Sequence, residues 1–312
     1  MITAPNWITR CVYGGFVLWG ISLFTFILFA LSPGDPAEII LSNQSQAPGQ
    51  EQIDALRHTL ALDRSWPVRY MCWMGRVFTG DLGISWQTGR PVSAEILMCL
   101  APTLELALVA FVMVVLLSGA SGMIAAVFRH RFADHLIGLL TVLSSAMPPF
   151  WLGIMLAWGI SLKLKLLPVS GQGSFAHVIL PALSLALGIG LLQGSMLRSA
   201  LVKTMDADFI RFARSRGLGS FKIFFRHILP HALVPMISLW GICLGQLLGG
   251  AMIVESVFAR PGLGRLTVQA VMARDIPMVQ ALVLLICLTF VAVNGLTDLI
   301  HRRLDPVMGA NP

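Results

Sequence analysis

Residues Leu106–Phe128 read LALVAFVMVVLLSGASGMIAAVF, an unbroken run without a charged side chain. A helix of about 20 apolar residues is long enough to cross the ~30 Å hydrocarbon core of a bilayer. Because lipid offers the backbone no hydrogen-bond partner, a run of this kind is expected to be helical. It also lacks the alternation of apolar and polar residues typical of a β-barrel strand. The run therefore predicts a transmembrane helix.

Five further runs share this property. The six predicted spans are 11–31, 106–128, 136–162, 178–197, 232–254 and 276–297. Only 12% of the chain is charged and 56% is hydrophobic, whereas soluble domains carry about 25% charged residues. We therefore expect an all-α membrane protein with about six transmembrane helices, forming a single domain over residues 1–312. The first run exceeds the apolar core of a secretory signal and is expected to remain as a span. Pro148-Pro149 interrupts the third run, where a kink is expected.

The distribution of lysine and arginine predicts the orientation. With six spans both termini lie on one side, and the short loops on that side are rich in cations, above all the loop 198–231. The positive-inside rule places this loop and both termini in the cytoplasm. The long polar segment 32–102 is then extracytoplasmic, with short helices expected on the membrane surface. The net charge of +7 lies in loops between apolar runs, which favours contact with membrane lipid and not with nucleic acid.

Motifs for catalysis are missing from the sequence. None of the four lysines, Lys163, Lys165, Lys203 and Lys222, lies in a phosphate-binding turn, so no P-loop ATPase is expected. There is no zinc-binding HExxH or Cys-x-x-Cys pattern and no nucleophile elbow. We expect no catalytic residue, metal site or cofactor in this chain. The sequence leaves open whether Cys72 and Cys99 form a disulfide.

Residues Asp206–Pro235 read DADFIRFARSRGLGSFKIFFRHILPHALVP. Phe209, Phe212 and Ala213 are spaced as on one apolar face of a helix, and Asp208 lies at its front, where an acid complements the helix dipole. Gly217 suits the position that ends a helix. The pattern predicts a short amphipathic helix in the cytoplasm, which either lies on anionic lipid or docks on a soluble partner.

This stretch resembles the EAA loop of ABC-importer permeases, in the form typical of the peptide/opine/nickel branch. The residues that carry the resemblance are Asp208, Phe209, Arg211, Phe212, Ala213, Arg214, Gly217, Leu218, Leu229 and Pro230; Arg211, Phe212 and His227 depart from the general consensus. Further matches, in family order, are Gly34-Asp35-Pro36, residues 80–85, Pro91-Val92, residues 102–106, residues 179–181, Glu255 with Phe258, residues 261–265, Arg274-Asp275 with Pro277, and Asp305-Pro306.

The resemblance implies a type I importer in a bacterial inner membrane. Its expected partners are a second permease subunit, two cytoplasmic ATPases that bind ATP and Mg, and an extracytoplasmic binding protein. The helix around Asp208–Arg216 would be the coupling helix. Phe209 and Phe212 would anchor it in the ATPase, and Arg211 and Arg214 would make polar contacts. A stand-alone secondary transporter is the alternative, but it would need midplane ionisable residues, which the six runs lack.

The substrate is predicted from weaker similarities. The segment Gly249–Glu255, GGAMIVE, with Phe258-Ala259 and Leu304-Asp305-Pro306, is closer to nickel permeases than to dipeptide permeases. This favours nickel or a metal–chelator (metallophore) complex, with di- or oligopeptides as the alternative.

Two further sets of residues are candidates for function. Gly241, Gly245 and Gly249 recur every four residues and predict a helix-packing surface. The acids at the ends of spans, Glu105, Glu255 and Asp298, are candidates for the translocation path, with interfacial acids as the alternative interpretation.

Overall fold

The computed structural model describes the backbone of residues 6–31, 35, 37–38, 40–41, 49–59 and 63–304, and the side chains of these residues except 6–11, 248–250 and 297–304. Within this part of the chain every regular element is a helix, as the sequence predicts. The helices gather into two compact units. Unit 1 comprises Met1–Ala101 and Pro261–Val291, and unit 2 comprises Pro102–Arg260 and Ala292–Pro312.

Unit 1 contains α1 (Asn6–Ala30), α3 (Gln50–Thr59), α4 (Trp66–Phe78) and α13 (Leu263–Met272), with the first residues of α5 (Val92–Val127) and α14 (Ile276–Leu304). Its core consists of Val92, Ile96, Leu263, Ala270, Met278, Val279, Ala281 and Leu282. Helix α4 lies against α1, where Tyr70 hydrogen-bonds Ser22 over 2.8 Å and packs edge-on against Phe26. Cys72 and Cys99 do not form a disulfide with each other.

A tight loop between α4 and α5 joins two of the motifs noted in the sequence. Gly80 and Gly83 have φ angles of 81° and 86°, which residues with a Cβ rarely adopt. The loop then presents the Ser85 hydroxyl and the Gln87 amide to the buried Asp275 carboxylate, which also accepts a hydrogen bond from the Met278 amide. The Gly80–Ser85 motif and the Arg274-Asp275 motif therefore pack together although they are far apart in the sequence.

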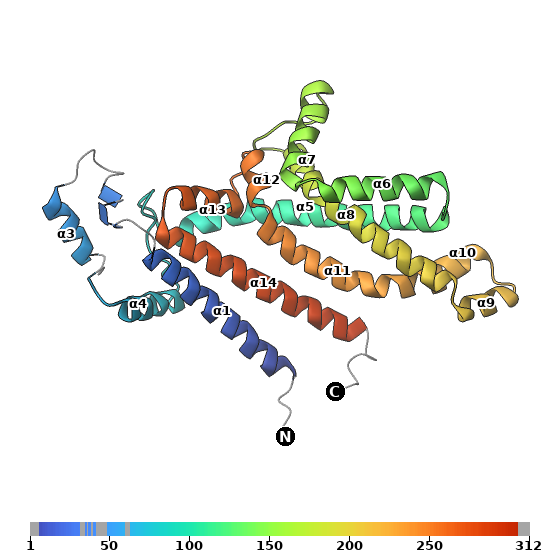
Figure 1. Ribbon diagram of the computed structural model, residues 1–312, viewed down its shortest axis with the longest axis horizontal. Coiled ribbons are helices and arrows are strands. Elements are labelled where there is room, and N and C mark those ends of the chain that lie inside the picture. Colours follow the sequence, from blue (N-terminus) through green and yellow to red (C-terminus); the bar gives the residue numbers. More distant parts are fainter. Residues whose placement is uncertain are drawn as a thin grey trace, which may run out of the picture. The chain divides into compact units, whose positions relative to one another are not determined.

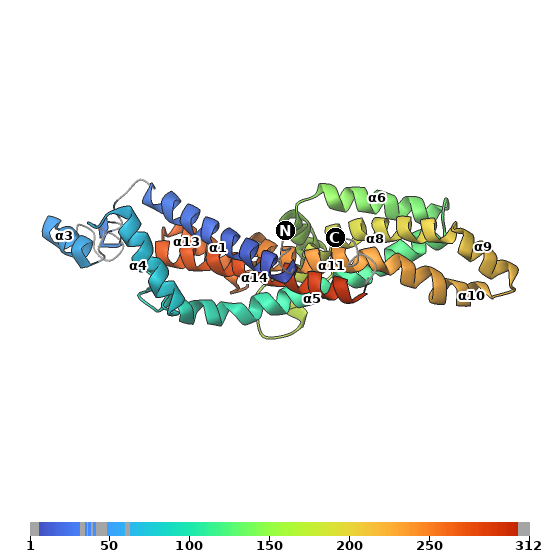
Figure 2. The same cartoon turned by 90° about the horizontal axis from the view of Figure 1, so that it is seen from below.

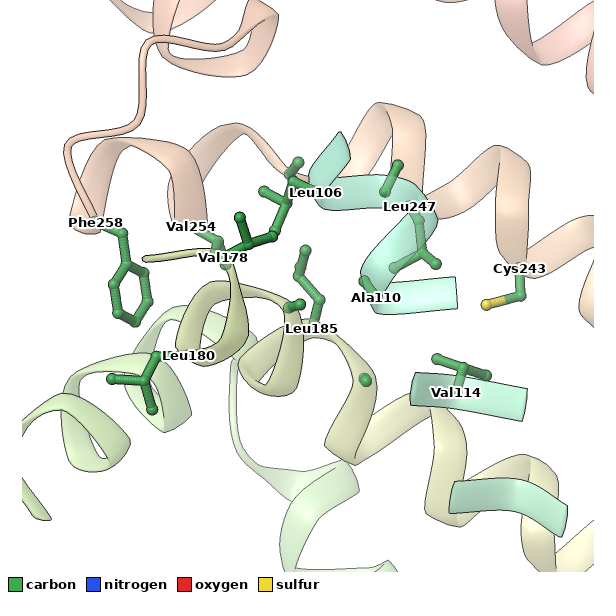
Figure 3. Packing of buried hydrophobic residues seen from close by; sticks show 14 residues of the cluster. Leu106, Ala110, Val114, Val178, Leu180, Leu185, Cys243, Leu247, Val254 and Phe258 are labelled. Atoms are coloured by element: carbon green, nitrogen blue, oxygen red, sulfur yellow. The ribbon is translucent and has the colours of Figure 1, made fainter. Parts of the chain in front are cut away.

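Unit 2 contains the rest of α5 and α14 together with α6 (Phe132–Ala146), α7 (Pro149–Leu156), the π-helix η1 (Ala157–Lys163), α8 (Ala176–Met205), α9 (Asp208–Ser215), α10 (Ser220–Ile223), the π-helix η2 (Phe224–Ile228), α11 (Leu229–Gly250) and α12 (Met252–Val257). Helix α8 is central, since α6, α7 and α11 all pack against it (Figure 1). Side chains of α5, α8, α11 and α12 form the main core, from Leu106 to Phe258 (Figure 3).

Small residues bring α5 and α8 into close contact. A Cβ added at Gly194 would lie 2.0 Å from the Ser121 hydroxyl oxygen, and one at Gly190 would lie 2.9 Å from the Leu117 Cβ. Backbone carbonyls also border this contact, because a Cβ at Gly122 would lie 2.7 Å from the Gly194 oxygen. The sequence analysis singled out the glycines of α11 and not this set.

Among the described residues, five helices are long and apolar enough to span a membrane. They cover Val12–Ala30, Val92–Val127, Ala176–Met205, Ser220–Leu247 and Ile276–Leu296. The third predicted run forms two helices, Phe132–Ala146 and Pro149–Lys163, with a bend of 110° between them. They would make a sixth span if counted together. Proline explains the break, because the residue before a proline disfavours helical backbone and Met147 and Pro148 both adopt extended conformations.

Candidate functional site

The predicted cytoplasmic helix is α9, which spans Asp208–Ser215. It begins after an extended Ala207 and ends at Gly217, whose φ angle is 75°. The Gly217 amide donates to the Arg214 carbonyl over 2.9 Å, and the Leu218 amide donates to the Ala213 carbonyl over 3.4 Å. These two bonds form a Schellman motif, which satisfies carbonyls at the end of the helix. Gly217 therefore ends the helix, as the sequence predicts.

One face of α9 is anchored in unit 2. Ile210 is fully buried in a cluster with Leu197 and Leu201 of α8 and Met236 of α11. Ala213 and Leu218 pack against the same cluster. Sequence reasoning assigned the apolar face to Phe209, Phe212 and Ala213 and missed Ile210. The helical periodicity fits burial of Ile210 and burial of Phe209 equally well, so the sequence could not show which of the two side chains is buried.

The opposite face of α9 is exposed and combines aromatic and basic side chains. Phe209 and Phe212 are 46% and 65% exposed, and the Arg216 guanidinium lies 5.9 Å from the centre of the Phe212 ring. Arg211 and Arg214 are also exposed, and Arg211 lies 3.4 Å from the Asp208 carboxylate. Large exposed aromatics beside arginines are the composition that recurs at the centre of protein interfaces.

α10 and η2 lead from α9 into α11, and α9 and α10 together form the tip of unit 2 at the ends of α8 and α11 (Figure 2). Phe221 is 78% exposed and packs against Phe225 with ring centres 4.5 Å apart, so α10 also exposes an aromatic side chain. Pro230 lies in the first turn of α11, directly after the π-helix. A proline lacks the amide that an ordinary helical turn would use, so the wider turn accommodates it.

Two of the three predicted path acids lie at one corner of unit 2. Glu255 is fully buried and accepts a 2.7 Å hydrogen bond from the Thr103 hydroxyl. Glu105 is half exposed and forms a 2.9 Å ion pair with the buried Arg260, whose guanidinium also contacts the Pro102 carbonyl. A buried charge without a partner is costly, and these contacts compensate Arg260. The sequence analysis did not single out Arg260 or Thr103.

Other predicted residues are less completely described. The side chain of Asp298, the surroundings of Gly249, and Gly34, Pro36, Asp305 and Pro306 lie outside the described residues. Gly241 and Gly245 lie in α11, where Gly245 is buried, and their packing role stays a prediction. Among the described residues, no three His, Cys, Asp or Glu side chains are placed to hold a metal ion.

Unit 1 holds an ion pair in its polar segment and a cavity between that segment and α13. Arg57 donates to Asp35 over 2.6 and 2.9 Å, and this hydrogen bonding and charge attraction raise the pKa of Arg57. A cavity of about 530 Å³ is lined by Gln87, Thr88, Glu95, Leu266, Gln269, Met272 and Ala273. The Thr88 hydroxyl donates to the buried Glu95 over 2.5 Å, so this carboxylate is held in place at the cavity wall.

Comparison with protein families accounts for most of the chain. Residues 118–309 match the family described as binding-protein-dependent transport system inner membrane component, and residues 6–107 match its N-terminal companion family. The chain belongs to this permease family. The family assignment agrees with the resemblance carried by the loop around α9.

Similar proteins extend over nearly the whole permease. It is 34% identical over 291 residues to the glutathione transport system permease protein GsiC of Escherichia coli, covering 93% of this chain and 94% of that protein. GsiC of Salmonella typhimurium is 36% identical over 288 residues, covering 92% and 93%.

Solved structures share the fold. An inward-facing MetNI methionine ABC transporter aligns with a TM-score of 0.57 at 16% identity, covering 67% of this chain and 96% of that one. An amino acid ABC transporter aligns with a TM-score of 0.52 at 15% identity, covering 68% and 94%. The permease therefore has the type I ABC-importer permease fold. It is a multi-pass inner-membrane subunit of an ABC importer and not an enzyme.

Proposed function

We propose that this permease lines half of a substrate path and is driven by a separate ATPase that binds α9 from the cytoplasm. In this proposal both termini are cytoplasmic, a second permease subunit completes the path, and a binding protein delivers substrate from outside. The permease itself binds no nucleotide; ATP and Mg are held by the ATPase subunits.

The observation that carries the proposal is the division of α9 into two faces. Ile210 fixes the helix to α8 and α11 of the same chain, while Phe209 and Phe212 face outward beside arginines. A helix held in this way can transmit a push from a partner to the spans behind it, because packed helices move as rigid elements. Exposed aromatics supply the anchors for that partner.

For the substrate we propose glutathione or another short peptide. The GsiC proteins to which the permease is similar belong to glutathione transport systems. The nickel or metal–chelator substrate favoured by the segment Gly249–Glu255 has no support from these relatives and stays the alternative.

The docking role is tested by copurification of the ATPase with the permease from membranes. We expect Phe212→Asp to abolish copurification, because it places a charge where an apolar anchor must be buried. Phe78→Asp is the matched control, since Phe78 is an 83% exposed phenylalanine on α4 and should retain the ATPase. Normal copurification of Phe212→Asp would contradict the docking role.

The substrate is tested in proteoliposomes that contain both permeases, the ATPases and the binding protein. Uptake of radiolabelled glutathione is measured with ATP inside the vesicles and with excess unlabelled glutathione, a dipeptide or nickel as competitor. ATP-dependent uptake that glutathione competes away supports the peptide-type substrate. Uptake of radioactive nickel without uptake of glutathione would support the alternative, and uptake without ATP would favour a stand-alone transporter.

A further inference from the structure

A network of ion pairs joins the turn between α5 and α6 to α8 and to the base of α9. The turn comprises residues 128–131, and His130 there has a φ angle of 62°, unusual for a residue with a side chain. The His130 amide donates to the Asp134 carboxylate over 3.0 Å. Asp134 lies in the first turn of α6 and therefore holds this turn in its bent form.

Asp134 is also held by α8. The Arg198 Nε donates to Oδ1 of Asp134 over 2.6 Å, and its Nη2 donates to Oδ2 over 2.5 Å. The two side chains are 28% and 11% exposed. A two-pronged arginine–carboxylate contact restricts orientation as well as distance. The first turn of α6 is thus fixed to α8 about two turns before α8 ends.

A second pair ties the same turn to the base of α9. The Arg129 Nη1 lies 3.2 Å from Asp206 Oδ2, and Asp206 follows α8 and precedes α9 by two residues. Both side chains are largely exposed, at 43% and 62%, so this pair is weakened by solvent. The turn is therefore linked strongly to α8 and weakly to the start of α9.

We propose that the Asp134–Arg198 pair is a positioning element that makes α6 follow the coupling helix, with Arg129–Asp206 as a weaker second link. The inference rests on the proposed docking of α9. A push on α9 reaches α8 and α11 through the buried cluster around Ile210. No residue of α6 belongs to that cluster. The ion pair fixes the first turn of α6 to α8, and α6 also packs along α8, where the Thr141 hydroxyl lies 3.5 Å from the Leu191 carbonyl.

The test measures glutathione uptake per ATP hydrolysed in the same proteoliposomes, together with the stimulation of ATP hydrolysis by the binding protein. Arg198→Gln removes the charge while leaving the Asp134 contact to the turn intact. We expect both readouts to fall at least about fivefold with ATPase copurification unchanged, the lower end of typical coupling between sites. Arg198→Lys keeps the charge but cannot make the two-pronged contact, so both readouts should fall less in this variant. In Asp206→Asn both readouts should change twofold at most, as expected of an exposed pair.

The control is Asp54→Asn, which removes the exposed partner of Arg57 on α3 and should leave both readouts unchanged. Unchanged readouts in Arg198→Gln would overturn the proposal. If that variant does not accumulate, the double variant Asp134→Asn/Arg198→Gln, which leaves no unpaired charge, is measured in its place. Failure of both to accumulate would assign the pair a folding role and would likewise overturn the proposal. If glutathione is not taken up, the stimulation of ATP hydrolysis by the binding protein is the readout that tests the proposal.

The two proposals fail in different ways. If Phe212→Asp retains the ATPase, the docking role of α9 fails, and the linkage that rests on it fails as well, even where Arg198→Gln loses stimulation. If Phe212→Asp loses the ATPase and Arg198→Gln keeps full coupling, docking stands and the linkage fails.

Discussion

At the scale of single residues, glycine acts in this permease in two distinct ways. Gly217 supplies a left-handed backbone conformation that ends α9. Gly194 supplies space, because α8 approaches Ser121 of α5 too closely for a side chain. Both roles predict that alanine is harmful, but for different reasons and with different controls.

For Gly217, we predict that Gly217→Ala raises hydrogen exchange in the α9 amides about fivefold. A residue with a Cβ costs roughly 1 kcal/mol in the left-handed region. Hydrogen exchange followed by mass spectrometry in detergent measures the effect. Gly219→Ala is the control, since Gly219 has an ordinary φ angle of −62° and nothing lies within 4 Å of its added Cβ. Equal exchange in the two variants would show that Gly217 has no special role.

For Gly194, we predict that Gly194→Ala lowers the thermal stability of the purified permease. Overpacking of a well-packed contact typically costs about 1–3 kcal/mol. The second substitution Ser121→Ala should recover part of the loss, because it removes the oxygen that lies 2.0 Å from the new Cβ. Gly119→Ala, which is also on α5 but has nothing within 4 Å of its added Cβ, should be neutral. Thermal unfolding in detergent compares the four proteins.

At the scale of elements, α9 is a short helix whose stability comes from its surroundings. Isolated helices of this length are marginal in water, so packing must hold it in place. Ile210 supplies that packing, and the Schellman turn at Gly217 closes the helix. Phe209 adds a contact to α11, where its ring centre lies 5.2 Å from that of His231, whereas the more exposed Phe212 contributes little to holding α9 on its own chain.

This division predicts opposite results for two substitutions in α9. Ile210→Ala should loosen the helix by about 2–5 kcal/mol, the usual cost of emptying a buried isoleucine site. Phe212→Ala should leave it in place. Limited trypsin digestion measures the difference, because Arg211, Arg214 and Arg216 are exposed cleavage sites in and after α9. Faster cleavage in Phe212→Ala than in Ile210→Ala would show that the faces are assigned the wrong way round.

At the scale of the whole molecule, the side of the membrane that each loop faces decides which partners it can reach. The proposal places α4 outside and α9–α10 in the cytoplasm. An exposed native cysteine, Cys72 on α4, serves as a reporter for the outer side. A cysteine introduced at the exposed Ser220 of α10 reports on the other side.

We predict that a membrane-impermeant maleimide labels Cys72 in intact spheroplasts. In a Cys72→Ser background, Ser220→Cys should be labelled only after the membrane is permeabilised. Labelling of the tip in intact spheroplasts would place α9 outside and would remove its access to a cytoplasmic ATPase. Cys72→Ser without the introduced cysteine is the control for background labelling.

The membrane fold and the short helix α9 could be predicted because both depend on neighbours in the chain. Twenty apolar residues in succession are enough to require a helix in lipid, and the left-handed preference of Gly217 is a property of one residue and its turn. The family resemblance rests on short motifs of the same local kind. The proline pair likewise predicted a kink in the third run.

Contacts between distant residues could not be predicted in this way. The 110° bend after Ala146, the inward placement of Ile210, and the pairing of Arg260 with Glu105 or Arg198 with Asp134 each depend on how helices pack. Helical spacing shows which residues share a face but not which partner that face meets. The close α5–α8 contact at Gly194 is of the same kind, because the space a glycine leaves has meaning only when a second helix fills it.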